Sequence, residues 1–356
     1  MAKKYKYRHR EIYKDVPIDV KANTTGDLMA KVEKARKRID RQMIDADTTL
    51  DKFVDTYLSA YKSSTVSPDT YAFLVSVGNK IVDGIGNIRV SRIKPIMVQE
   101  FLNSCAGYKE GYVKKIYQET CQIFTHAYKN GLLSIDYATI LEQPRGRPSD
   151  TGRSLTPRER KVLLEVLPGH RGEIFCKLML YCGIRPGEAM ALQWKDIDFN
   201  AATLTVNKSY KRSGHIGIPK SEAAYRTIPI PMHLIPLLAE HRAGPMQRVC
   251  VNSDGKSYNE NSRRAMWKSV KRAMNIAMGC RVKNRKLLPP LPLDDKFDMY
   301  FLRHTYCTDL ERAGVPINVA RRLMGHANIN ITAKIYTHYN DESIERARQM
   351  IDSAAM

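Results

Sequence analysis

Residues 302–338 read LRHTYCTDLERAGVPINVARRLMGHANINITAKIYTH, and the rest of the chain is organised around this stretch. The pattern predicts a helix over 299–313 that carries Arg303, and a second helix over 316–324 that ends at Gly325. His326 follows the glycine, and Tyr336 lies further along. The stretch therefore places an arginine, a histidine and a tyrosine near the end of the sequence. The same two helices are also compatible with a DNA-binding helix-turn-helix.

These residue types suit phosphoryl transfer. A pentacoordinate phosphorus carries negative charge on its non-bridging oxygens, and planar guanidinium groups match those oxygens with two hydrogen bonds each. A phenol has a pKa near 10, so Tyr336 needs a cationic pocket and a proton acceptor to attack a phosphate at neutral pH. The stretch is therefore expected to form a centre that cuts DNA.

A second arginine lies in the run Gly183-Ile184-Arg185-Pro186-Gly187-Glu188. A buried helix is predicted over 174–182, and Arg185 follows it in a Pro-Gly turn. Glu188 begins the next helix and is expected to orient the arginine. An Arg-Glu pair that only caps a helix would explain this turn equally well.

A lysine lies on a predicted hairpin. Residues 197–207 and 214–230 alternate and are interrupted by turn residues, which predicts a small antiparallel sheet with Lys220 on its hairpin. Residues 214–221 come within one residue of a phosphate-binding loop, but Pro219 replaces the glycine whose amide must approach the phosphate. A strand rather than a helix is also expected to follow, so no nucleotide site is predicted here.

Together these motifs resemble the signature of the tyrosine recombinase (phage integrase) family. Arg185 resembles the family's first arginine, and Lys220, followed by Arg226-Thr227-Ile228-Pro229, resembles its lysine hairpin. Arg303 resembles the second arginine, Gly325-His326 the Gly-His pair, and Tyr336 the nucleophile. The motifs are separate and occur in the family's order.

The resemblance implies a role for each residue. Arg185 and Arg303 would clamp the phosphate, Tyr336 would form a 3′-phosphotyrosyl intermediate, and Lys220 would protonate the leaving 5′ oxygen, while His326 would help to hold the phosphate. The reaction would need neither a cofactor nor a metal. Tyr300 stands where the family usually has histidine; a phenol there can donate a hydrogen bond to a phosphate oxygen but is a poor base.

The composition is compatible with a DNA-binding protein. Lys plus Arg number 58 against 37 Asp plus Glu, which gives a formal net charge of +21. A large positive field attracts polyanions, although a ribosomal or membrane-surface protein would share it. The seven cysteines are an odd number without close pairs, which favours reduced thiols over disulfides or a zinc site. No membrane partner is expected, and the predicted location is the cytoplasm of a bacterium, close to the nucleoid.

The first 45 residues are predicted to form a module of their own. Strands over 5–13 and 16–22 are followed by a helix that begins after Thr24 and carries lysines and arginines on one face. Many integrases begin with a module of this kind, which grips accessory "arm" DNA sites. A solvated basic tail with a nascent helix is the alternative.

The remainder divides into two further parts. Residues 47–143 are predicted to form a helical unit that resembles the family's core-binding, SAM-like domain, and 144–154 are predicted to be a linker. Residues 155–356 would be the catalytic domain, beginning at a capping box, Thr156 to Glu159, and ending in an amphipathic tail helix. That tail is expected to pack either on a neighbouring subunit or on its own domain.

The predicted fold class is therefore multidomain and mainly α with small β-sheets: a β-β-α module, a helical core-binding domain and an α+β catalytic domain. The expected function is site-specific recombination of duplex DNA by a homotetramer assembled on paired attachment sites, with a possible accessory DNA-bending or excision factor. A DNA-binding regulator that has lost catalysis and a type IB topoisomerase-like enzyme are the alternatives.

Overall fold

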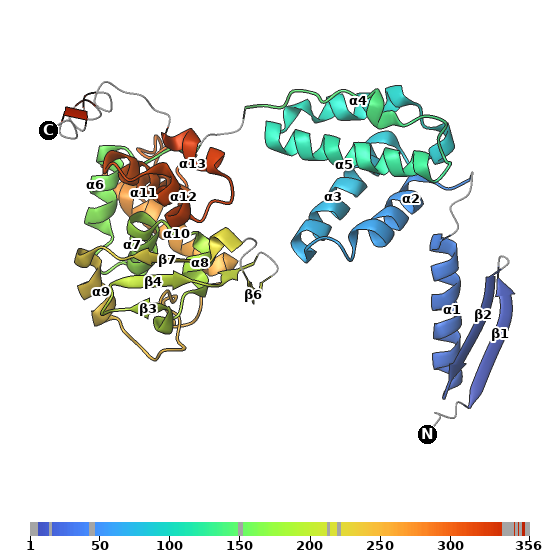
Figure 1. The fold of residues 1–356 in the computed structure, drawn as a ribbon, viewed down its shortest axis with the longest axis horizontal. Coiled ribbons are helices and arrows are strands. Elements are labelled where there is room, and N and C mark those ends of the chain that lie inside the picture. Colours follow the sequence, from blue (N-terminus) through green and yellow to red (C-terminus); the bar gives the residue numbers. More distant parts are fainter. Residues whose placement is uncertain are drawn as a thin grey trace. The chain divides into compact units, whose positions relative to one another are not determined.

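The structure is a computed structural model that describes residues 6–13, 16–42, 47–148, 152–211, 214–218, 222–336, 345, 348 and 351–352. At residues 16, 37, 38, 40–42, 222 and 334–336 it describes the backbone alone. The chain forms two compact units, Met1–Asp150 and Thr151–Met356 (Figure 1).

The first unit begins with a ββα module. Strands β1 (Tyr7–Tyr13) and β2 (Val16–Ala22) pair antiparallel, and α1 (Thr25–Gln42) packs against them. Ile18 and Val32 are buried between the sheet and the helix. The predicted strands and helix are present, so the alternative of a tail with only a nascent helix is wrong for these residues.

The same unit contains a helical bundle. Its helices are α2 (Leu50–Tyr57), which continues as a π-helical turn Leu58–Lys62, α3 (Pro68–Ile85), α4 (Pro95–Ser104) and α5 (Glu110–Lys129). Ser67 caps α3 by accepting a hydrogen bond from the Thr70 amide, and a proline opens both α3 and α4. A single hydrophobic core, which includes Phe53, Ile81, Leu102 and Phe124, holds the four helices together.

The second unit surrounds a larger core with helices and short sheets. Its helices are α6 (Pro157–Val166), α7 (Glu173–Cys182), α8 (Pro186–Ala191), α9 (Ile235–Glu240), α10 (Glu260–Ala277), α11 (Tyr300–Arg312), α12 (Ile317–Met324) and α13 (Ile329–Tyr336). A sheet in the order β3-β4-β7 is built from Ile197–Asp198, Thr203–Val206 and Arg226–Pro229. Two small hairpins are β5-β6 (Ser209–Tyr210 and Ile216–Gly217) and β8-β9 (Val282–Lys283 and Lys286–Leu287).

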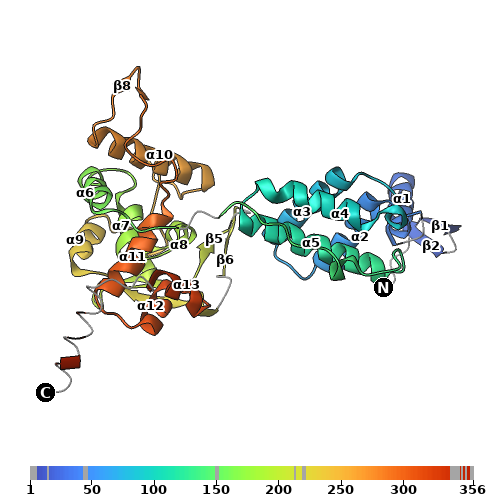
Figure 2. The same cartoon turned by 90° about the horizontal axis from the view of Figure 1, so that it is seen from above.

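Helices α7 and α11 lie side by side in this unit (Figure 2). Leu178 and Met179 of α7 and Leu302 of α11 belong to the same buried core. Gly183 ends α7 in the left-handed conformation with φ 61°, and a Cβ on it would lie 2.1 Å from Cδ1 of Tyr306. Glycine is therefore required at the point where the chain turns from α7 toward Arg185.

The predicted strands were too long. The segment 197–207 contains two short strands separated by a turn, and 214–230 is interrupted by a 3-10 turn, Glu222–Ala224, between β6 and β7. The antiparallel pairing itself is as expected, with Leu204 opposite Ile228. Alternation of side chains does not distinguish a continuous strand from short strands joined by turns.

The seven cysteines are all free, as predicted, and all but Cys121 are buried. The described helices include none with the length and apolar character needed to cross a membrane. Most of the predicted tail helix lies outside the described residues.

Candidate active site

Arg303 is a buried cation on the first turn of α11. The residue is 4% exposed, and its guanidinium donates hydrogen bonds to the carbonyl oxygens of Gly183 and Met324. Burial and the charge of the neighbouring Arg185 lower the pKa of Arg303 to about 9, so it is still protonated at neutral pH. Among the described residues no carboxylate lies within ion-pair distance of it. A buried positive charge with only carbonyl partners is well suited to accept an anion.

Arg185 directly precedes the first residue of α8. Glu188, on the first turn of that helix, accepts hydrogen bonds from both the backbone and the side chain of Arg185. Glu188 Oε2 accepts a hydrogen bond from the Arg185 backbone amide at 2.8 Å, and Oε1 pairs with Nη1 at 2.8 Å. The other terminal nitrogen donates to Gly325 O at 2.7 Å. The side chain remains 33% exposed. Glu188 therefore orients Arg185, as predicted, and also caps the helix.

Arg226 is a third arginine of this cluster, and it was not among the site residues predicted from the sequence. Its Nη1 and Nη2 donate to the two carboxylate oxygens of Glu188 at 3.1 and 2.8 Å, and its Nε donates to Leu323 O at 2.7 Å. The signal that could have revealed it is the alternation along β7, because Arg226 and the fully buried Ile228 face the same side.

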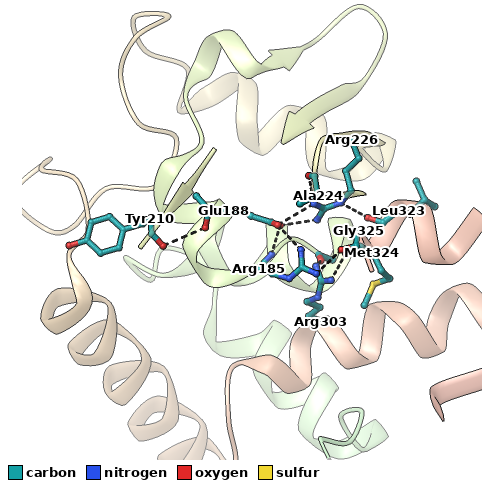
Figure 3. Close-up of polar contacts among 11 residues, drawn as sticks. Arg185, Glu188, Tyr210, Ala224, Arg226, Arg303, Leu323, Met324 and Gly325 are labelled. Atoms are coloured by element: carbon teal, nitrogen blue, oxygen red, sulfur yellow. Dashed lines mark hydrogen bonds and ion pairs between the residues drawn. The ribbon is translucent and has the colours of Figure 1, made fainter. Parts of the chain in front are cut away.

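The three arginines converge on the end of α12 (Figure 3). Gly325 ends this helix with φ 63°, and the amides of Gly325 and His326 donate back to Arg322 O and Arg321 O. The next three carbonyl oxygens, those of Leu323, Met324 and Gly325, accept from Arg226, Arg303 and Arg185 respectively. Carbonyl groups at a helix C-terminus lack intrahelical partners and carry partial negative charge, so guanidinium groups stabilise them.

The residue that follows this turn is His326, which is 8% exposed. Its Nδ1 is hydrogen bonded to the Thr332 hydroxyl at 2.9 Å, which leaves Nε2 as the ring nitrogen available to a substrate. Burial, together with the positive charges of Arg303, Arg185 and Arg226, lowers the pKa of His326 to about 3. The imidazole is therefore neutral at physiological pH.

The charges in the cluster do not cancel. Burial acts to raise the pKa of Glu188, but its hydrogen bonds and charge interactions with Arg226, with further help from Arg185, lower that pKa to about 2. Three guanidinium groups therefore face one ionised carboxylate and one neutral imidazole. The net positive charge and the partly exposed Arg185 make the cluster suitable for binding a phosphate.

The structure describes the other three predicted site residues to different extents. Tyr300 is the first residue of α11, one helical turn before Arg303, and is 47% exposed. Tyr336 is the last residue of α13, where the structure describes the backbone alone, and Lys220 lies outside the described residues. The structure thus brings Arg185, Arg303 and His326 together.

Acid should destabilise the second unit because of His326. Its folded-state pKa is lowered to about 3 from 6.5, so between these values the unfolded chain takes up a proton that the folded chain does not. The stability contributed by neutral His326 should therefore fall as the pH falls below 6.5. Both tryptophans, Trp194 and Trp267, belong to this unit, so their fluorescence during urea unfolding reports on it.

The range from pH 7 to pH 5 separates this effect from that of Glu188, which titrates in more acid solution. His326→Gln has no titrating group at this position and is expected to show a flatter dependence of the urea midpoint on pH than the parent. Equal slopes for the parent and the variant would contradict the assignment of a depressed histidine pKa.

Residues 153–343 match the model of the phage integrase family, and residues 49–106 match the model of the phage integrase N-terminal SAM-like domain. A tyrosine recombinase XerC-like protein of Caldanaerobacter subterraneus subsp. tengcongensis is 29% identical over 326 residues, which covers 82% of this chain and 80% of that protein. A tyrosine recombinase of Thermosipho africanus is 30% identical over 297 residues, covering 80% of this chain and 89% of that protein.

Solved structures of similar fold include the integrase of transposon Tn1549 in complex with a circular intermediate DNA. The match has a TM-score of 0.67 at 17% identity and covers 85% of this chain and 99% of that one. A lambda integrase dimer bound to a COC′ core site matches with a TM-score of 0.59 at 17% identity, covering 83% of this chain and 98% of that one. At this identity the matches support the similarity of fold.

Proposed function

The chain belongs to the phage integrase family of tyrosine recombinases, and we propose that it recombines duplex DNA with Arg185, Arg303 and His326 around the scissile phosphate and Tyr336 as nucleophile. The observation that carries this assignment is the cluster in which three guanidinium groups face one carboxylate. Such a cluster is short of negative charge, and a phosphate diester would supply it.

The proposed reaction begins at the Tyr336 hydroxyl, whose oxygen attacks phosphorus as its proton passes to a water molecule of the solvent. A bond forms between the tyrosine oxygen and phosphorus, and the bond from phosphorus to the 5′ oxygen breaks. Lys220 gives a proton to that oxygen, so the products are a 3′-phosphotyrosine and a free 5′ hydroxyl. Since one phosphodiester replaces another, a 5′ hydroxyl of a second strand can reverse the step without an external energy source.

The neighbouring groups have supporting roles in this proposal. Arg185 and Arg303 stabilise the charge on the non-bridging oxygens, and neutral His326 offers Nε2 to the same phosphate. Tyr300, an exposed side chain at the first position of α11, donates a hydrogen bond to a phosphate oxygen in place of the usual histidine. The reaction needs no cofactor or metal in this mechanism.

The other parts of the chain are assigned to DNA binding and assembly. We assign the module at 1–45 to arm-type sites, the helical unit at 47–143 to the core site, and 155–356 to catalysis, with 144–154 as the linker. We further infer a homotetramer on paired attachment sites, acting on DNA in the bacterial cytoplasm. The solved structures of similar fold bound to circular-intermediate and core-site DNA support the assignment of these parts to DNA binding.

A recombinase differs from the two alternative functions in what it needs and what it produces. A topoisomerase-like enzyme would act as a monomer on any duplex, whereas a recombinase exchanges strands between two copies of a specific site. A regulator would bind DNA without cleaving it. Incubation with one and with two attachment sites on separate duplexes tests the proposal, and recombinant duplexes that appear only with two sites support it. Relaxation of a supercoiled plasmid that lacks the site would contradict it.

A basic groove in the second unit is a further candidate for contact with the DNA backbone. It lies between α10 and the β8-β9 hairpin, and Arg264 and Lys268 on α10 are exposed along it. Its cationic side chains are those of Arg263, Arg264, Lys268, Lys271, Arg272, Arg285 and Lys286. Cations that contact DNA phosphates release counterions, which makes binding depend on salt.

Replacement of Lys268 by alanine should therefore weaken binding to all duplexes alike. The slope of log K against log salt should become less steep by about 0.9 for each phosphate contact removed. Fluorescence anisotropy at several salt concentrations measures this slope. Lys161→Ala on α6, where the lysine is also exposed, is the matched control and should leave the slope unchanged. An unchanged slope for Lys268→Ala would remove it from the DNA interface.

A further inference from the structure

Arg226 and Glu188 form an ion pair that is almost completely buried. Their side chains are 1% and 3% exposed, and both carboxylate oxygens accept from the guanidinium, at 3.1 and 2.8 Å. The same two oxygens also accept from the side chain and the backbone amide of Arg185. The position of Glu188, and through it that of Arg185, is therefore fixed by Arg226.

The guanidinium of Arg226 also reaches the turn that precedes His326. Its Nε donates to Leu323 O at 2.7 Å, and Nη1 makes a second hydrogen bond to Ala224 O at 3.1 Å. Gly325 passes so close that a Cβ on it would lie 2.8 Å from Nη1. One planar group thus joins β7, the start of α8 and the end of α12 (Figure 3).

The contacts distinguish Arg226 from the two arginines assigned to the phosphate. A guanidinium has five N–H donors, and the contacts of Arg226 use the Nε donor, both donors of Nη1 and one donor of Nη2. Its partners include a carboxylate that already balances its charge. Arg303 has only carbonyl partners among the described residues, and Arg185 is 33% exposed. Arg226 is therefore poorly placed to bind a substrate.

We propose that Arg226 is a positioning residue for DNA cleavage: it holds Glu188 and the end of α12 together, and so sets the spacing between Arg185 and His326 without touching the phosphate. This inference rests on the proposed function of those two residues. A lysine cannot replace the arginine, because a single ammonium cannot bridge both carboxylate oxygens and Leu323 O in one plane.

The test compares DNA binding with cleavage in Arg226→Lys. The cleavage rate is measured in single turnover on a nicked duplex at saturating protein, the Kd for the same duplex by anisotropy, and folding by thermal unfolding. Arg226→Lys should bind DNA with the parent's Kd and cleave about a hundredfold more slowly, since misplacement by about 1 Å has an effect of this size.

The matched control is Arg160→Lys. Arg160 pairs with both carboxylate oxygens of Asp309 at 2.8 and 2.7 Å, in the same unit but outside the arginine cluster. It should cleave at the parent's rate. Rescue gives a second readout: free guanidinium ion should accelerate cleavage by Arg226→Ala and leave Arg160→Ala unaffected.

Several results would overturn the inference. Parent-like cleavage by a folded Arg226→Lys would show that the spacing between Arg185 and His326 does not depend on the guanidinium group of Arg226. An equal loss of DNA binding and cleavage would show that Arg226 contacts the DNA. If the single variants do not fold, the double variant Arg226→Met with Glu188→Gln removes both buried charges together, which avoids leaving one unpaired. Parent-like cleavage by that protein would also overturn the inference, and slow cleavage with intact binding would support it. Failure of the parent itself to cleave would instead contradict the proposed function.

Discussion

Arg303→Lys should fold and bind DNA but cleave it more slowly by on the order of a hundredfold or more, the effect of removing one preorganised donor to a developing oxyanion. The lysine keeps a positive charge in the buried position. It cannot donate to Gly183 O, Met324 O and a phosphate oxygen with the geometry of a guanidinium fork. Single-turnover cleavage of a nicked duplex at saturating protein measures the effect.

The Arg303 prediction requires that DNA binding and folding survive the substitution. The same anisotropy and thermal unfolding measurements establish this, and Arg160→Lys again serves as the matched control. Arg303→Ala should fold less stably and bind DNA more weakly than Arg303→Lys, because it leaves two buried carbonyl oxygens without their donor. If Arg303→Lys cleaves near the parent's rate, the guanidinium does not hold the phosphate.

Arg185→Ala should lose on the order of a hundredfold or more in cleavage, with a smaller effect on folding than Arg303→Ala. The smaller effect on folding is expected because Glu188 keeps its ion pair with Arg226 and the Arg185 side chain is partly exposed. Its loss leaves Gly325 O without a donor at the turn before His326. The rate is measured in single turnover with the same nicked duplex.

A control for Arg185→Ala is Arg185→Lys, which keeps the positive charge but not the planar guanidinium group. Its cleavage rate should lie between those of the parent and Arg185→Ala. Equal rates for the two variants would mean that charge alone matters at this position. Cleavage by Arg185→Ala near the parent's rate would exclude it from the phosphate clamp.

Local features of the fold could be predicted from the sequence. Ser67-Pro68 and Thr156-Pro157 start helices because a side-chain oxygen caps the first amides and proline tolerates the first turn. Arg185 and Glu188 are three residues apart, so their pairing is also local. In each case the interacting groups lie within one helical turn, where the sequence itself determines the distance.

Contacts between distant segments could not be predicted in this way. Arg226 and Glu188 are 38 positions apart, and their ion pair depends on how β7 packs beside α8. The contacts of three arginines with the end of α12 involve backbone carbonyls, which every residue has, so no residue type marks them. Motifs identified Arg185, Arg303 and His326 but not Arg226, and packing determined which arginine is buried, paired or exposed.

Covalent trapping on the protein's own attachment site tests most directly whether the chain cleaves DNA through Tyr336. The parent and Tyr336→Phe are incubated with nicked duplexes, and SDS-stable adducts are separated and mapped by mass spectrometry. We expect an adduct with the parent alone, joined through Tyr336 to a 3′ phosphate. An adduct mapped to another residue, or none from a parent that binds the site, would contradict it.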